Sequence, residues 1–263
     1  MGDKSGIIRQ PLHQIRHKQR PGAFMQYKNT SFFSRFTALA LIGLLASLSL
    51  SGCTTLSSAT PEEKAASLVA KSEQVFSEFW ASNEKPLQQM RKLYPDAMGI
   101  VILPGVIKAG FVVGAEGGSG VMLARDLSGR WGYPAFYTMA AGSVGLQAGG
   151  QSSDIVLLLF SEKAVRALVK NQGKLGADLG LTVGTVSTGV EASTTSNVGA
   201  DIMAFSSGVG VFAGGSIEGA VMVTRNDFNN AYYGADVTPE QIVLDASVSN
   251  PGADKLRGVL TQN

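Results

Sequence analysis

The chain has 263 residues, which is enough for one large domain or two small ones. Its charge is unevenly divided: residues 1–52 carry seven Lys or Arg and one acid, a net charge of +6, whereas residues 53–263 carry 15 bases and 19 acids, a net charge of −4. The overall charge of +2 is therefore the property of the N-terminal segment, and the rest of the chain lacks the basic character of a nucleic-acid-binding domain.

The N-terminal segment is organised like a bacterial secretory signal. A fourteen-residue apolar run, residues 37–50, follows Lys28 and Arg35 and is shorter than the ~20 residues that a membrane-spanning helix needs. The run is followed by Ser-Gly-Cys, and two small residues before Cys53 resemble the lipobox of bacterial lipoproteins. We expect cleavage before Cys53 and acylation of this residue, which anchors the chain permanently because each buried CH₂ contributes ~0.8 kcal/mol.

The boundaries of this leader lead to an expected location. Met25 begins a signal of ordinary length, so we regard residues 1–24 as lying upstream of the true start, a hypothesis that any peptide from this segment found in cells would overturn. Thr54, and not Asp, follows Cys53, which resembles the pattern of lipoproteins sorted to the outer membrane and facing the periplasm. The predicted organisation is a leader (1–52), a lipidated tether (53–60) and one folded domain (61–263).

The residues that remain after cleavage exclude several kinds of catalytic and metal site. His13 and His17 both lie in the leader, and the single cysteine, Cys53, is the expected acylation site. Zinc sites made of Cys and His, Ser-His-Asp triads and Cys-His nucleophiles are therefore excluded. The field of possible enzymes is therefore narrow, and we predict no metal and no cofactor.

The elements of the predicted domain alternate in type along the chain. Thr60-Pro61-Glu62-Glu63 has the pattern of a capping box, and apolar residues at helical spacing behind it predict an amphipathic helix over 61–81, followed by a short helix over 85–93. From residue 97 onward, nine short apolar runs separated by Gly and Ser clusters predict antiparallel strands. Further helices are predicted over 161–171, 238–244 and 253–261.

This order of elements, with 27 glycines in the 211 residues after the leader, predicts an α+β domain. Its mainly antiparallel sheet is expected to be strongly coiled or barrel-like. The N-terminal amphipathic helix and a few short helices are expected to pack on it.

The stretch GFVVGAEGGSGVMLAR, residues 110–125, resembles at first a phosphate-binding loop. Such a loop requires a helix after its glycines, because the helix N-terminus supplies the amide donors, and here a strand and a DLSG turn follow instead. We therefore predict a β-hairpin in which glycine provides positive φ and a bulge. Glu116 and Glu218 each lie in a Gly-rich turn, and two readings stay open: a carboxylate pair for glycoside hydrolysis, or solvated hairpin glutamates.

Two groups of residues are candidates for lipid contact. Lys163, Arg166 and Lys170 recur at helical spacing, opposite apolar residues, and Lys174 extends the stripe beyond Gly173, which ends the predicted helix. Such a stripe can contact anionic headgroups, or it can be the solvated face of a helix packed on the sheet. An aromatic cluster can line a lipid pocket or pack as core; its members are Trp131, Tyr133, Phe136 and Tyr137.

Four stretches together resemble the SYLF family, a lipid-binding domain also described as actin-binding in its eukaryotic members. They are AGFVVGAEGGSGVMLAR (109–125), WGYPAF (131–136), GLQAGGQSSDIVLLL (145–159) and residues 201–233 with the run FSSGVGVFAGGSIEGAVM ending in NAYY. The resemblance implies binding of phosphoinositides or other anionic phospholipids, and it implies no enzymatic activity.

This chain departs from the family pattern in two respects. It has a lipoprotein leader and shows no SH3 or FYVE pattern, so we do not expect the cytoskeletal role to carry over to a bacterial envelope. The 61–81 helix is similar in place to the lipid-binding helix of some relatives, but it is rich in acids.

The sequence therefore predicts a membrane-anchored lipoprotein whose SYLF domain binds membrane phospholipid. Cys53 is the lipidation site, and Lys163, Arg166, Lys170 and Lys174 are the headgroup-binding residues. The alternative is a structural or protein-interaction module of the envelope, with a protein partner that the sequence does not identify.

Overall fold

The structure is a computed structural model that describes residues 59–110, 113–144, 149–170, 173–176, 180–188, 199–209, 217 and 219–263. The chain divides into two compact units, Met1–Ser57 and Ser58–Asn263, and the described residues all belong to the second. The leader, Cys53 and Glu218 lie outside the described residues.

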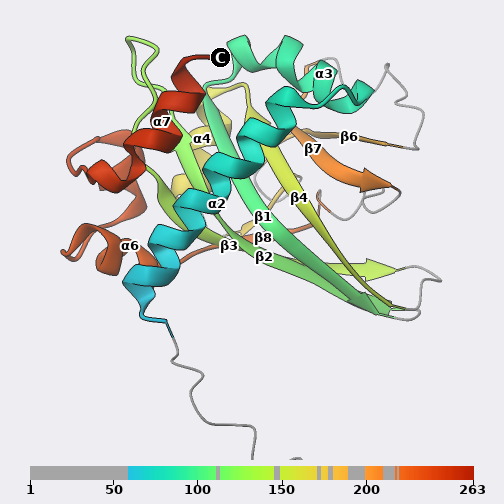
Figure 1. The fold of residues 1–263 in the computed structure, drawn as a ribbon, viewed down its shortest axis with the longest axis horizontal. Helices are drawn as coiled ribbons and strands as arrows, with labels where there is room; N and C mark the ends of the chain where they lie inside the picture. Colours follow the sequence, from blue (N-terminus) through green and yellow to red (C-terminus); the bar gives the residue numbers. More distant parts are fainter. Residues whose placement is uncertain are drawn as a thin grey trace, which may run out of the picture. The chain divides into compact units, whose positions relative to one another are not determined.

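The second unit is built on one sheet, which has eight strands within the described residues, in the order β5-β8-β3-β2-β1-β4-β7-β6 (Figure 1). Only the β6–β7 pair is parallel among these neighbours. The strands are β1 (Gly99–Gly110), β2 (Val113–Ala124), β3 (Ala135–Val144), β4 (Gly149–Leu159), β5 (Gly173–Lys174), β6 (Val183–Thr188), β7 (Ile202–Val209) and β8 (Val221–Thr224). The predicted α+β fold with a mainly antiparallel sheet is confirmed. The barrel-like form that was also expected is not found, because the sheet of the described residues is open, with β5 and β6 at its edges.

Helices cover both faces of this sheet. One face packs against α2 (Pro61–Ala81), α3 (Lys85–Leu93), α6 (Asn226–Tyr233) and α7 (Asp254–Thr261), and α2 crosses over the central strands (Figure 1). The other face packs against α4 (Glu162–Lys170) and the π-helical turn η3 (Glu240–Leu244). Short 3₁₀ turns, η1 (Tyr94–Asp96) and η4 (Pro251–Ala253), follow α3 and precede α7.

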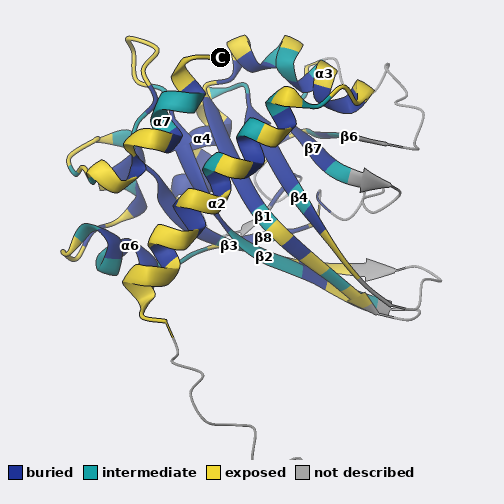
Figure 2. Ribbon diagram, in the orientation of Figure 1, coloured by how far each residue is buried: buried dark blue, intermediate teal, exposed yellow. Residues whose placement is uncertain are grey.

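The two helical layers explain why the strands are apolar runs without polar alternation. In β1, Val101 belongs to the core under α4, whereas its neighbours Ile100 and Ile102 belong to the core under α2. All three are fully buried. Figure 2 shows the same burial along the central strands beneath α2. A sheet buried on both faces needs apolar side chains at consecutive positions.

Several predicted helices are confirmed, and one helix was not predicted. Helices over 61–81 and 85–93 are present, and Thr60 forms the predicted capping box with Glu63. The later helices are slightly shorter than predicted. The unpredicted helix is α6, whose sequence NDFNNAYY has weak helix formers; Phe228 and Tyr232 hold it by edge-to-face contacts with Phe136. None of the described helices combines the length and apolarity needed to span a bilayer.

The predicted β-hairpin is present as the antiparallel pair of β1 and β2, but the glycines do not form its turn, because the whole of GAEGGSG lies inside β2. The positive φ is found instead in β1, at Gly105 (φ +61°), whose N–H donates to the Asp154 carboxylate at 2.8 Å. Between the pairs Ile102↔Val121 and Ile107↔Gly117, β1 has four residues and β2 has three, so β1 bulges.

The glycines of β2 make room for this bulge. A Cβ atom on Gly120 would lie 2.1 Å from the carbonyl oxygen of Ile102, and one on Gly118 would lie 3.0 Å from Cα of Val106. Close approach of two backbones, and not a turn, is the reason for glycine here.

Candidate functional site

The α4 helix separates its apolar and basic residues cleanly. Its buried face packs into the core and consists of Ala164, Val165, Ala167, Leu168 and Val169. The basic residues Lys163, Arg166 and Lys170 are all exposed. Lys174 lies in β5, and its side chain is outside the described part of the structure, so the extension of the stripe to this residue stays a prediction.

The exposed bases of α4 differ in their surroundings. Arg166 forms an i,i+4 ion pair with Glu162, with its Nη2 atom 2.6 Å from Oε1, and its side chain is 50% exposed. Lys163 donates through Nζ to the carbonyl of Gly180. Ion pairs as exposed as that of Arg166 are weak, so the guanidinium can exchange its partner at low cost.

The aromatic residues from the sequence analysis do not form one cluster. Trp131 and Phe136 are buried in the core under α2 and α7, whereas Tyr137 is buried on the opposite face. Trp131 stacks on Tyr94 at 5.8 Å between ring centroids and donates from Nε1 to the Leu260 carbonyl at 3.2 Å. Core packing is thus their main role, although Trp131 and the half-buried Tyr133 also line a cleft.

Glu116 is not a solvated hairpin residue. It lies in the middle of β2 with a fully buried side chain, and its cross-strand partner in β1 is Lys108, whose Nζ lies 3.8 Å from Oε2. The expectation of a solvated glutamate fails because the glycine-rich stretch is a strand of the sheet, in which the Glu116 side chain is buried. A carboxylate in this position has no access to a polysaccharide.

A cleft of about 980 Å³ lies beside α4, where the segment before β1, the turn after β2, the segment after η3 and α7 converge. Four arginines contribute to its lining: Arg125, Arg130, Arg166 and Arg257. Three carboxylates also line it: Asp96, Asp126 and Glu162. Of the basic stripe on α4, only Arg166 reaches this cleft.

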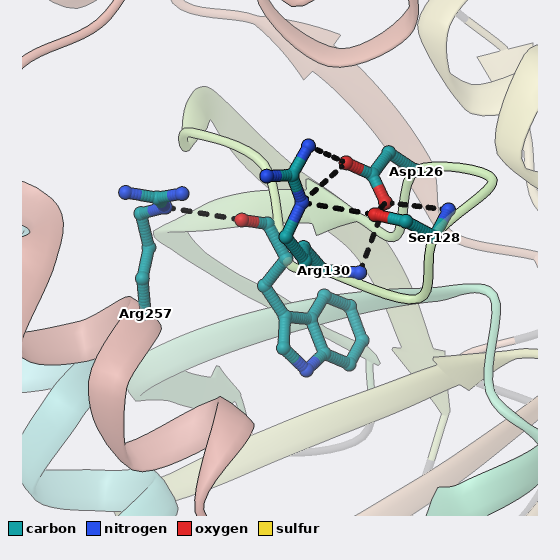
Figure 3. A network of polar contacts seen from close by, with 5 residues as sticks. Asp126, Ser128, Arg130 and Arg257 are labelled. Atoms are coloured by element: carbon teal, nitrogen blue, oxygen red, sulfur yellow. Dashed lines mark hydrogen bonds and ion pairs between the residues drawn. The ribbon is translucent and has the colours of Figure 1, made fainter.

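The turn at the mouth of the cleft is tightly hydrogen-bonded (Figure 3). One oxygen of Asp126 accepts from Ser128 N at 2.8 Å, Ser128 Oγ at 2.6 Å and Arg130 N at 3.0 Å. These donors, above all the Ser128 hydroxyl and the Arg130 amide, lower the pKa of Asp126 to about 2. Leu127, at the tip of this turn, is fully exposed.

Arg257 joins the C-terminal helix to this turn. Its Nε donates to the Trp131 carbonyl at 3.0 Å (Figure 3), its guanidinium lies 4.0 Å from the Tyr133 ring centroid, and Nη1 pairs with Asp254 at 2.9 Å. The position of α7 therefore decides the shape of the cleft wall.

Three of the four arginines have a carboxylate partner. Arg130 pairs with Asp126 at 3.1 Å, Arg166 pairs with Glu162, and Arg257 pairs with Asp254. Arg125 has no carboxylate within 4.0 Å among the residues that the structure describes.

Arg125 is held by neutral groups instead. Its guanidinium lies 4.7 Å from the Trp131 ring centroid and 5.3 Å from that of Tyr94, and Nη1 donates to the Pro95 carbonyl at 3.2 Å. Burial raises the pKa of Tyr94 well above its ordinary value although Arg125 acts in the opposite direction, so this phenol is no counter-anion at physiological pH.

Sequence reasoning missed Arg125, Arg130 and Arg257. The first two flank the DLSG turn, and an arginine on each side of a tight turn was the available signal. Arg257 lies 126 residues after the Trp131 carbonyl to which it donates, and no local pattern indicates that contact.

The fold and the cleft define a class of protein: an α+β domain with one open sheet, helices on both faces, and an arginine-lined cleft at one end of α4. Residues 140–263 match a family profile, Ysc84, described as "Las17-binding protein actin regulator". Residues 140–263 of this chain therefore resemble the Ysc84, or SYLF, domain family.

Relatives in eukaryotes are similar to this chain over more than half of its length. "SH3 domain-containing YSC84-like protein 1" of Xenopus laevis is 35% identical over 156 residues, which is 59% of this chain and 46% of the relative. "Protein YSC84" of Saccharomyces cerevisiae is 33% identical over 167 residues, 62% of this chain and 36% of the relative. The Homo sapiens "SH3 domain-containing YSC84-like protein 1" is 33% identical over 165 residues, which is 62% of this chain and 48% of the relative. The chain thus spans about half, or less, of the length of these relatives.

Proposed function

We propose that this chain is a membrane-anchored lipoprotein whose SYLF domain binds anionic phospholipid headgroups, phosphoinositides among them, without catalysing a reaction. In this proposal Cys53 carries the acyl anchor, the leader is removed, and the domain lies at the periplasmic face of a bacterial outer membrane. Membrane phospholipid is the principal partner.

The separation of residues on α4 is the observation that carries the proposal. The apolar face of this helix is fully used by the core, so its exposed bases are not needed for packing, although Lys163 contacts the Gly180 carbonyl and Arg166 pairs with Glu162. Lys163 and Lys170 are exposed, and Arg166 is exposed and lines the cleft. Each positive charge near an anionic membrane contributes ~1 kcal/mol, and two or three of them produce a useful attraction when an acyl anchor already holds the domain at the surface.

Charge reversal on α4 tests the headgroup contact. The full chain carries Cys53→Ser, so that no acyl group masks the effect, together with Lys163→Glu, Arg166→Glu and Lys170→Glu. We measure binding to phosphatidylglycerol vesicles relative to phosphatidylcholine vesicles, because the apolar leader contributes to both. The preference for anionic vesicles should fall by roughly one to two orders of magnitude.

A matched control distinguishes an effect of the α4 site from an effect of the changed net charge. Lys64→Glu, Lys71→Glu and Lys92→Glu make the same change at exposed positions of α2 and α3, on the opposite side of the sheet. An equal loss of binding in both variants would show that α4 is not the headgroup-binding site. A loss confined to the control would move the site to α2, the helix that some relatives use.

The anchor has a separate test. Incorporation of labelled palmitate into the wild-type chain but not into Cys53→Ser is the expected result. Equal labelling of both would contradict acylation at this residue. Membrane fractionation of the wild type then identifies the membrane that holds it.

A protein-interaction role in the envelope is the second candidate, because the family profile is described by its binding to a protein. Ionic strength discriminates the two, since attraction to headgroups weakens as salt screens the charges, whereas an apolar docking surface does not. Catalysis by carboxylates is the least supported role, because the Glu116 side chain is buried. Absence of glycan cleavage by the wild-type chain is the expected result, and cleavage that is lost in Glu116→Gln would reverse this conclusion.

A further inference from the structure

Arg125 is the unusual group in the cleft. It is partly buried, it lines the cavity, and its Nε atom is buried without a hydrogen-bond partner within the described residues. A guanidinium has five N–H donors and stays charged at every physiological pH. The Pro95 carbonyl accepts from Nη1, and a side-chain hydrogen bond between the guanidinium and the Tyr94 hydroxyl acts to lower the pKa of Tyr94.

Among the residues that the structure describes, no carboxylate lies within 4.0 Å of Arg125 to compensate its charge. The rings of Trp131 and Tyr94 provide cation–π contact, but they are neutral. Two of the three carboxylates that line the cleft, Asp126 and Glu162, are already paired with other arginines, and the third, Asp96, forms no ion pair with Arg125. Taking a cation out of water costs free energy unless an anion or hydrogen-bond acceptor replaces the water. The packing around Arg125 therefore suits an anion that enters from the cleft.

The shape of the cleft limits the kind of anion. Its volume of about 980 Å³ is in the range of sites for small molecules, and its lining combines arginine donors with the apolar Val165 and Val243. A planar guanidinium fork binds phosphate and carboxylate oxygens in pairs, and a second arginine nearby favours the more highly charged phosphate.

We propose that Arg125 is the anion-binding residue of a phosphate site in this cleft, with Arg166 on the α4 wall as the second cation. The ligand class is a phosphate ester, which either a phospholipid headgroup or a free phosphorylated small molecule supplies. The inference rests on the proposed lipid binding only if the phosphate belongs to a phospholipid headgroup. In either case it identifies Arg125 as the residue that binds the phosphate.

Two exposed apolar side chains at the cleft make a lipid source testable. Leu127 is fully exposed on the hydrogen-bonded turn, and Met98 is 47% exposed; both line the cleft. Apolar side chains beside arginines at the mouth of a headgroup site can enter the interface of a bilayer while the cations meet phosphate.

The experiment uses the full chain in nonionic micelles, with inorganic phosphate and glycerol phosphate as soluble probes. Binding is followed by calorimetry and by Trp131 emission in a Trp80→Phe background, since the chain has two tryptophans. Arg125→Gln should weaken binding about tenfold or more, because hydrogen bonds to a charged group are lost. Asp96→Asn, which removes a carboxylate from the lining, should strengthen binding several-fold.

The matched control is Arg225→Gln. Arg225 also stacks on a ring, 3.7 Å from the Phe228 centroid, but it pairs with Asp227 and is not among the residues that line the cleft. Ser249→Asp supplies a second route if Arg125→Gln does not fold, because it adds a negative charge to the lining at an exposed position and should also weaken binding. The proposal is wrong if the parent chain binds neither probe and does not prefer anionic vesicles. It is also wrong if the Arg125 variant binds like the Arg225 control.

Vesicles distinguish the two sources of phosphate. A lipid source predicts that both Arg125→Gln and Leu127→Ser lower binding to phosphatidylglycerol vesicles. Binding of soluble probes without a preference for these vesicles assigns the site to a free phosphorylated molecule, and refutes the proposed lipid function while the site stands. The opposite result is that Lys163→Glu/Lys170→Glu loses vesicle binding while Arg125→Gln is unaffected in every assay. It would support the lipid function and show that Arg125 does not bind the phosphate.

Discussion

The substitution Gly120→Ala tests whether the glycines of β2 serve close backbone approach. Its Cβ atom would lie 2.1 Å from the Ile102 carbonyl oxygen and 2.8 Å from Cδ2 of Leu103, whereas ordinary Cβ contacts stay beyond 3.0 Å. The distance from this Cβ atom to the oxygen would therefore be about 0.9 Å too short. This clash cannot be relieved by a rotamer change, because the obstructing atom belongs to the backbone of the bulged strand.

The strands β1 and β2 would have to separate at the centre of the sheet, where both faces are buried. The expected loss is about 3–5 kcal/mol of the free energy of unfolding, at the upper end of single substitutions. Chemical denaturation of the full chain, followed by far-ultraviolet circular dichroism, measures this loss.

Gly142→Ala is the matched control. Gly142 also lies in a strand, β3, but its added Cβ atom would meet no atom within 4 Å, and its φ is not positive. Its stability should change by less than about 1 kcal/mol. If Gly120→Ala is as stable as Gly142→Ala, the explanation of the glycine-rich stretch by the β1 bulge is refuted.

Two local predictions concern the start of α2 and the turn at the cleft. Thr60→Ala removes the side chain that accepts from Glu63 N at 3.2 Å, and should lower the free energy of unfolding by about 1 kcal/mol. Thr60→Ser keeps a hydroxyl at this position and should lose only a small part of that stability. Equal losses in the two variants would contradict the capping box. The carboxyl of Asp126 has a folded-state pKa of about 2 against an ordinary 3.8, so its stabilising contribution is complete above pH 3.8 and is lost as the pH falls through about 2. Amide resonances of Ser128 and Arg130 should therefore titrate with a midpoint near pH 2, and a midpoint at or above 3.8 would show that the turn is open in solution.

The confirmed predictions rest on local patterns. Thr60, Pro61 and Glu63 signal the start of a helix by their order alone, and the capping box is present in the structure. Apolar runs such as 155–159 specify strands buried on both sides, because five consecutive apolar residues leave no polar face. The family resemblance, carried by such stretches, is confirmed by the Ysc84 profile.

The missed features depend on distant parts of the chain. A glycine needed for a turn and a glycine needed for close approach are the same letter, and only the bulge in β1 distinguishes them at Gly120. The α6 helix has weak intrinsic propensity and is held by Phe136 of β3. Arg125, Arg166 and Arg257 come from three elements, so their meeting has no signature in residue spacing.

The amino-acid sequence by itself determined the α+β class, the capped N-terminal helix and the basic stripe on α4, because helix caps and hydrophobic periodicity act between residues a few positions apart. It also carries the leader with Cys53, whose acylation stays a prediction. The tertiary structure alone decided that the glycine-rich stretch is part of a strand, that Glu116 is buried, and that four arginines line one cleft with Arg125 lacking a carboxylate partner among the described residues. The physical reason is that desolvation and charge compensation depend on which surfaces the fold brings together.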